Sequence, residues 1–147
     1  MNRRSGFTLV ELVVVVLILG ILAAIAAPKI INNSDKASDS SVASTLAAIR
    51  DAVELYKAEK NGKLPTSASG GSPSVTEFQN ALDPYLRGTG FPYCKVGGVN
   101  SNSVNIQNTG PSVTGTAGWS YNYLTGEIII NSNQTMLSDS STAYSSL

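Results

Sequence analysis

The first part of the chain contains a nearly uninterrupted run of apolar residues, from Phe7 to Ala27. A short basic and polar segment precedes the run, and one ionisable residue, Glu11, lies inside it. An α-helix of this length would be about 31 Å long, which matches the hydrocarbon core of a bilayer. The pattern therefore predicts a helix able to span a membrane. A carboxylate inside such a helix is costly, and it usually marks a functional residue.

A second helical pattern follows the apolar run. Apolar residues recur at steps of four and three residues and predict one buried stripe on a helix, formed by Val42, Leu46, Ile49, Val53 and Tyr56. Asn61-Gly62 supplies a left-handed C-cap, and Pro65 follows it. We therefore expect an amphipathic continuation of the same helix that ends near residue 61, with its stripe packed against a sheet.

Two helix-breaking residues, Gly20 and Pro28, lie within or directly after the apolar run. Proline removes a backbone donor and disfavours the helical conformation of the residue before it. This predicts a kink or a loosened turn near residues 24–28, without ending the helix. Such residues are common in membrane helices, but they also allow a helix to stretch or melt, and we favour this hinge role.

The rest of the chain predicts a small α+β region. A Ser- and Gly-rich stretch predicts a loop at 66–74, followed by a short helix at 75–86 that Pro84 limits. Modest strand candidates lie at 91–96 and 103–107. The strongest hairpin signal joins 119–124 to 127–131 through Thr125-Gly126, and the polar residues 132–147 predict a loop, a short edge strand or a frayed tail. The expected fold is an α+β lollipop, a long helix packed on an antiparallel sheet of three or four strands.

Composition narrows the possible chemistry. The 147 residues carry 10 basic and 10 acidic side chains, so charge predicts no nucleic-acid partner. The sequence has no histidine, and Cys94 is its one cysteine, so no intrachain disulfide can form. No nucleophile–base pair, metal cluster or phosphate-binding loop is visible. We therefore expect a protein that is not an enzyme and that binds no cofactor or metal.

The segment Gly6-Phe7-Thr8-Leu9-Val10-Glu11 closely resembles the class III signal sequence of type IV pilins and type II secretion pseudopilins. In that family, a prepilin peptidase cuts after the glycine and methylates the new N-terminal residue. The resemblance implies cleavage between Gly6 and Phe7, N-methylation of Phe7, and a role in assembly for Glu11 and the neighbouring Thr8. Pro28 also matches the position of the family's helix-breaking proline.

The resemblance also implies an organisation and a set of partners. The chain would divide into a leader peptide (1–6), a transmembrane and filament-core helix (7–27), an amphipathic helix (28–61) and a globular region (62–147). Its copies would form a helical filament with the help of an assembly ATPase and an inner-membrane platform protein. Arg3 and Arg4 predict a single-pass inner-membrane protein with a cytoplasmic N-terminus, later part of an extracellular pilus or a periplasmic pseudopilus.

Removal of the leader would leave a charged amine on Phe7 one helical turn before the Glu11 carboxylate. Opposite charges attract strongly in a low dielectric, and each is costly to leave unpaired there. When helices bundle with an axial stagger, the amine of an incoming subunit can meet Glu11 of its neighbour. We expect Glu11 to set the register of the filament in this way.

Two other readings of the N-terminus remain open. Arg3-Arg4, the apolar run and Ala24-Ile25-Ala26 also fit an ordinary secretory signal, which would release a soluble domain that begins near Ala27. A third reading is a simple one-span anchor that is never cut. Glu11 argues against the secretory signal, because the corresponding region of such a signal is apolar.

The choice between pilus and pseudopilus also stays open. Major pseudopilins often carry a calcium site in the loops after the long helix. Their later Asp-Pro-Trp-Gly stretch is not present here, since Asp83-Pro84 is followed by Tyr85-Leu86. Asp139 is a lone acid, so we expect no structural calcium. This absence favours a pilin, whereas the small domain and the missing cysteine pair favour a pseudopilin.

Overall fold

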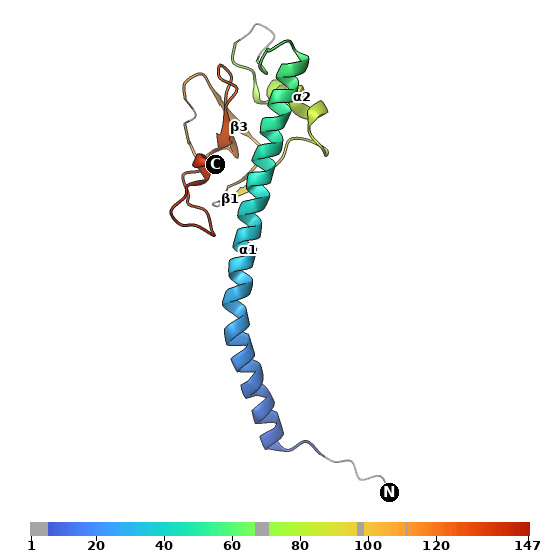
Figure 1. The fold of residues 1–147 in the computed structure, drawn as a ribbon, viewed down its shortest axis with the longest axis vertical. Coiled ribbons are helices and arrows are strands. Elements are labelled where there is room, and N and C mark those ends of the chain that lie inside the picture. Colours follow the sequence, from blue (N-terminus) through green and yellow to red (C-terminus); the bar gives the residue numbers. More distant parts are fainter. Residues whose placement is uncertain (1–5, 67–70, 97–98, 111) are drawn as a thin grey trace.

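The computed structural model describes residues 6–66, 71–96, 99–110 and 112–147, apart from the side chains of residues 31–32. One long helix carries a small head at its C-terminal end, and its first half extends away from this head (Figure 1). The helix, α1 (Leu9–Glu59), has 51 residues and is about 77 Å long at 1.5 Å per residue. The expected α+β lollipop is confirmed.

The C-terminal end of α1 has the cap that the sequence predicts. Asn61 and Gly62 both have positive φ, 56° and 83°. The Gly62 N–H donates to the Lys57 carbonyl at 2.7 Å, which satisfies one of the last free carbonyls of the helix. Pro28 lies inside α1, and the helix continues through it with a gentle curve (Figure 1).

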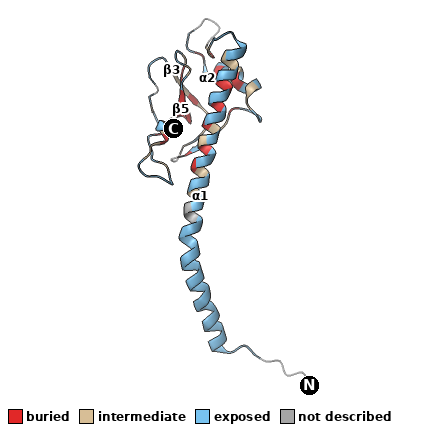
Figure 2. Ribbon diagram, in the orientation of Figure 1, coloured by how far each residue is buried: buried red, intermediate tan, exposed pale blue. Residues whose placement is uncertain are grey.

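The head packs on the predicted stripe of α1, and Figure 2 shows the buried residues of the helix confined to its second half. The stripe residues Val42, Leu46, Ile49 and Val53 are buried, and Tyr56 is partly buried. The short helix α2 (Val75–Leu82) starts with a capping box between Ser74 and Glu77 and buries Phe78 and Leu82. A 3₁₀ turn, η1 (Asp83–Tyr85), follows it.

The strands form two small sheets. In the first, β1 (Cys94–Val96) pairs antiparallel with β2 (Val99–Ser101). The second has the order β3-β4-β5, from β3 (Val104–Gln107), β4 (Trp119–Asn122) and β5 (Ile128–Ile130). The predicted β4–β5 hairpin is confirmed, but β3 runs parallel to β4. The expectation of antiparallel pairing is therefore wrong at β3, because the long connection between β3 and β4 returns the chain to run in the same direction.

Strand β4 is buried on both faces. Trp119 and Tyr121 share the core face, where the Trp119 indole donates to the Pro92 carbonyl at 2.9 Å. On the other face, Ser120 accepts from Gln107 Nε2 at 2.7 Å, and Asn122 Nδ2 donates to the Thr109 carbonyl at 3.2 Å. These polar side chains hold the β3–β4 connection over the sheet, which the apolar–polar alternation of β4 gave no reason to expect.

The start of β4 lies very close to the first sheet. A Cβ on Gly118 would lie 2.1 Å from the Ser101 carbonyl oxygen and 2.8 Å from Cys94 Cβ. We therefore predict that Gly118→Ala lowers the free energy of unfolding by about 3 kcal/mol, as overpacking does. Gly110→Ala is the matched control, because nothing described lies within 4 Å of its Cβ position. Thermal unfolding in detergent checks this, and equal stability of the two variants would contradict the close contact.

Candidate processing and assembly site

The predicted cleavage position lies just before the start of α1. Gly6, Phe7 and Thr8 are not helical, and Thr8 is extended, with φ −80° and ψ 149°. No described atom of the chain lies within 4 Å of a Cβ built on Gly6. The Gly6–Phe7 bond thus lies in a non-helical, uncovered segment of the kind that a peptidase can bind. Arg3 and Arg4 lie outside the described residues.

Thr8 and Glu11, the two predicted assembly residues, form a capping box at the start of α1. The Thr8 N–H and hydroxyl both donate to Glu11 Oε2, at 2.8 and 2.7 Å. The Glu11 N–H donates back to Thr8 Oγ1 at 3.3 Å. Within one chain, the Glu11 carboxylate therefore has Thr8 as its partner, which satisfies a group that would otherwise be costly in apolar surroundings.

The apolar half of α1 is exposed over its whole described length. Phe7 is 80% exposed, Leu9 77% and Ile30 67%. In the described part of the chain, α1 is the one helix long and apolar enough to cross a membrane by length and composition. Figure 2 shows this half without buried residues. Because so much apolar surface is unstable in water, it requires lipid or the helices of other molecules as its surroundings.

The predicted hinge residues, Gly20 and Pro28, both lie in this exposed and continuous half of α1. They are eight residues apart, about 12 Å along the axis. A Cβ on Gly20 would meet nothing described within 4 Å. Neighbouring parts of the described chain therefore do not restrain the helix at Gly20, and the hinge role stays a prediction.

Acidic residues of the head form no described metal cluster: no group of three or more His, Cys, Asp or Glu side chains lies together among the described residues. Asp139 instead binds its own turn, where it accepts from the Ser141 hydroxyl at 2.6 Å and the Thr142 hydroxyl at 2.6 Å. These hydrogen bonds lower the pKa of Asp139 to about 2. The expected absence of calcium stays a prediction.

Cys94 lies in β1 and is buried, as expected for a strand thiol. Burial raises the pKa of its thiol to about 11, which keeps it protonated and unreactive at neutral pH. Cys94 is therefore a core side chain.

The buried carboxylate of Asp39 was not predicted from the sequence. Asp39 is 2% exposed and accepts from the backbone N–H groups of Leu137 (3.3 Å) and Ser138 (2.7 Å) and from the Tyr144 hydroxyl. Its polar neighbours suggest a solvated stretch. The available signal is its spacing, because Asp39 lies three residues before Val42 and so on the same face of the helix.

Arg50 gives the C-terminal segment a second attachment to α1. Its Nε and Nη2 donate to the Ile128 carbonyl at 3.3 and 3.2 Å, and its Nη1 donates to the Leu147 carbonyl at 2.9 Å. Arg50 follows Asp39 by 11 residues, about three helical turns, so both lie on one side of α1.

Residues 132–147 are thus an ordered loop rather than a frayed tail, with η2 (Tyr144–Ser146) and a Thr135–Ala143 bridge inside it.

Comparison with known proteins agrees with this geometry. Residues 1–27 match the family model described as prokaryotic N-terminal methylation motif. The chain is 38% identical to the type II secretion system core protein G of Aeromonas hydrophila over 83 residues, 56% of this chain and 57% of that protein. It is also 38% identical to core protein G of Vibrio cholerae over 91 residues, 62% of each. The matched segment thus covers less than two thirds of either relative.

A pilus protein matches over more of its own length. The chain is 40% identical over 85 residues to the type IV narrow pilus major component PilA5 of Thermus thermophilus, 54% of this chain and 72% of that protein. No solved structure matches the chain significantly. With the methylation motif at its start and this match to a pilus component, the chain belongs to the family of type IV pilins and type II secretion pseudopilins.

Proposed function

We propose that the chain is a processed and N-methylated structural subunit of a helical filament, either a type IV pilus or a type II secretion pseudopilus. The observation that carries this proposal is the exposed apolar half of α1, which begins directly after an uncovered Gly6–Phe7 bond. Copies of the chain can bury this surface against each other in a filament core. The names of the relatives support the same assignment.

In this proposal the subunit follows one route. A prepilin peptidase removes the leader (1–6) and methylates Phe7, while residues 7–27 hold the chain in the inner membrane with its N-terminus in the cytoplasm. An assembly ATPase and an inner-membrane platform protein then drive it into the filament. The head, residues 62–147, ends on the outer side of the membrane, in an extracellular pilus or a periplasmic pseudopilus.

Glu11 directs assembly in this route. Before assembly, its carboxylate is held by Thr8 within the same chain. During assembly, the amine of Phe7 on an incoming subunit approaches Glu11 of its neighbour and forms a charge pair in the apolar core. Gly20 and Pro28 allow the helix to adjust its length and curvature as the subunits pack.

The proposal assigns no catalytic step to this chain. The sequence lacks histidine, and its single thiol is buried with a raised pKa. The balanced charge likewise offers no surface field for nucleic acid. The chain acts as a structural element, and its partners supply the chemistry and the energy.

We predict that the mature protein from cells begins with methylated Phe7. Intact-mass and N-terminal peptide mass spectrometry of the membrane and filament fractions measure this directly. A protein that begins near Ala27 would support the ordinary secretory signal instead, and one that keeps Met1 would support an uncut anchor. As a matched control, Gly6→Leu is expected to leave the leader attached, while the head folds normally.

The type of filament is decided by where it is found. Electron microscopy of filaments sheared from the cell surface, probed with an antibody to the head, is expected to label long fibres if the chain is a pilin. A chain that is methylated but stays with the cell envelope would be a pseudopilin. Either outcome is consistent with the role of filament subunit, and each assigns the filament to one of the two classes, pilus or pseudopilus.

A further inference from the structure

The head carries an open groove beside α1, with a volume of about 600 Å³. One wall is a face of α1 that points away from the core stripe, and the other wall is the segment after α2. The residues that line it include Asp51 and Leu55 on α1 and Tyr85, Leu86 and Arg87 after α2. Leu55 is 55% exposed there, although leucine is usually buried when a core is available.

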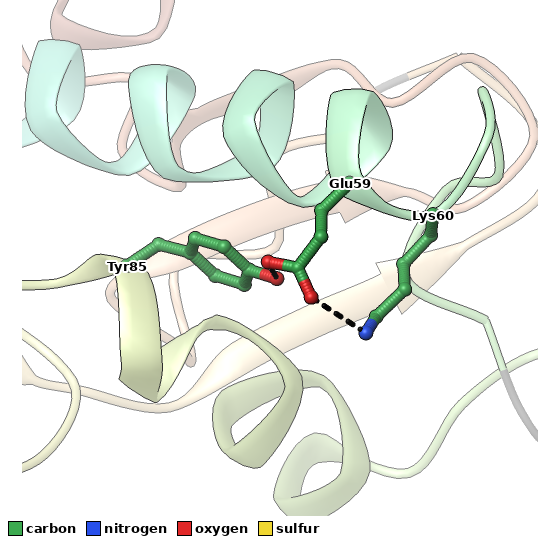
Figure 3. A network of polar contacts seen from close by, with 3 residues as sticks. All are labelled: Glu59, Lys60 and Tyr85. Carbon is green, nitrogen blue, oxygen red and sulfur yellow. Dashed lines mark hydrogen bonds and ion pairs between the residues drawn. The ribbon is translucent and has the colours of Figure 1, made fainter.

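The outer wall of the groove is held in place. The Tyr85 hydroxyl donates to Glu59 Oε2 at 2.5 Å, and Lys60 Nζ lies 2.9 Å from the other oxygen of the same carboxylate (Figure 3). The Tyr85 ring also packs edge-on against Tyr56, with the ring centroids 6.0 Å apart. These contacts join η1 to the end of α1, so the groove is already formed in a single chain.

Two charged side chains at the groove have no ion pair among the described residues. Arg87 lies on the outer wall and Asp51 on the helix wall, and both are exposed. The ion pairs of the described chain involve other residues. The groove thus offers apolar surface together with one free cation and one free anion.

The β4–β5 turn carries a matching set of groups. Leu124 lies in this turn and is 62% exposed, and Glu127 is exposed beside it. Two hydrogen bonds hold the shape of the turn: Asn122 Oδ1 accepts from the Leu124 N–H at 2.9 Å, and the Gly126 N–H donates to the Asn122 carbonyl at 2.8 Å. Leu64 lies next to Gly126, which places the exposed Lys63, the residue before Leu64, beside this turn.

These groups are complementary in sign. The β4–β5 turn presents one anion, Glu127. Lys63, which lies beside this turn, supplies one cation. The groove presents Arg87 and Asp51. An apolar knob and an apolar groove, each flanked by both signs of charge, can pair with specificity, since a wrong alignment brings like charges together.

We propose that the β4–β5 turn of one copy inserts Leu124 into the groove of a neighbouring copy, with Glu127 beside Arg87 and Lys63 beside Asp51. The inference rests on the proposed function, because it requires copies of the chain to assemble. Figure 1 shows α2 and the segment after it on one side of α1 and strands β3–β5 on the other. Two different surfaces on opposite sides of a subunit make a head-to-tail contact, which produces open helical filaments.

Charge reversal tests the contact in the full-length chain. Arg87→Glu and Glu127→Arg are each expected to lower the yield of assembled filament about tenfold, and the double variant is expected to restore it. Lys95→Glu, an exposed residue of β1 outside both surfaces, is the matched control and should leave the yield unchanged. Processing at Phe7 is measured in every variant and should not change. Wild-type yield in both single variants would overturn the contact.

Disulfide cross-linking tests proximity directly. Leu86→Cys and Leu124→Cys are made singly and together, and Cys94 stays in place because it is buried. Oxidised filaments of the double variant are expected to give a ladder of multimers, and the single variants should stay monomeric. Assembled filaments without a ladder would overturn this contact but not the subunit role. A wild-type chain that is never found in any filament would overturn the proposed function and the contact with it.

Discussion

Replacement of Glu11 by glutamine is expected to lower filament yield at least tenfold while leaving cleavage at Gly6–Phe7 in place. Glutamine still accepts from the Thr8 N–H, so the capping box and the start of α1 are retained. The change removes the charge alone, and with it the attraction for the amine of an incoming subunit in a low dielectric. Sheared filaments are measured by immunoblot against total processed protein, and mass spectrometry confirms the mature N-terminus.

Thr8→Val is the matched control for this experiment. Valine keeps the shape of threonine and leaves the Glu11 carboxylate charged, but it removes the hydroxyl that bonds to that carboxylate at 2.7 Å. Loss of such a cap costs about 1 kcal/mol, so we expect a smaller fall in filament yield than with Glu11→Gln. Normal filament yield and register in Glu11→Gln would contradict the hypothesis that the charge pair between Phe7 and Glu11 directs assembly. A greater loss in Thr8→Val would show that the cap, and not the charge, directs assembly.

Local patterns predicted the parts of the fold that depend on local physics. The stripe from Val42 to Tyr56 marks the buried face of α1, and Asn61-Gly62 marks its end, because spacing and positive φ are properties of a few neighbouring residues. The same is true of the hairpin through Thr125-Gly126. The parallel pairing of β3 with β4 depends instead on the path of the connection between them. That path is held by hydrogen bonds such as Asn122 to Thr109, which no periodicity encodes.

The candidate site divides in the same way. Gly6, Phe7, Thr8 and Glu11 lie within six residues, so one short motif contains the extended segment and the capping box. Asp39 acts on residues almost 100 positions later in the chain. A single acid in a polar stretch gives no sign of such a partner. Only its helical spacing from Val42, three residues, places it on the buried face. Long-range polar contacts of this kind require the folded structure.

Replacement of Asp39 by asparagine is expected to release the C-terminal segment from α1 and to lower the free energy of unfolding by about 2–4 kcal/mol. The carboxylate accepts three hydrogen bonds, from the N–H groups of Leu137 and Ser138 and from the Tyr144 hydroxyl. Asparagine has one oxygen in place of two and turns an NH₂ group toward one of these donors. Urea unfolding in detergent gives the stability, and hydrogen exchange of the segment amides reports its release. Asp35→Asn, one turn earlier and partly exposed, is the matched control and should change stability by less than about 0.5 kcal/mol.

The decrease in the free energy of unfolding caused by Asp39→Asn is also expected to depend on pH. Burial raises the pKa of the Asp39 carboxyl, but the hydrogen bonds from Ser138, Tyr144 and the Leu137 N–H outweigh it, and the net pKa lies below its ordinary value. Because the folded pKa is below the unfolded one, the charged carboxylate stabilises the fold above the ordinary aspartate pKa of about 3.9, and this contribution is lost as the pH falls through the folded value. The stability difference between wild type and variant should therefore be full at neutral pH and should shrink below about pH 4. A difference that stays constant through this range would mean that Asp39 is not charged in the folded protein, and that the segment is held by neutral hydrogen bonds alone.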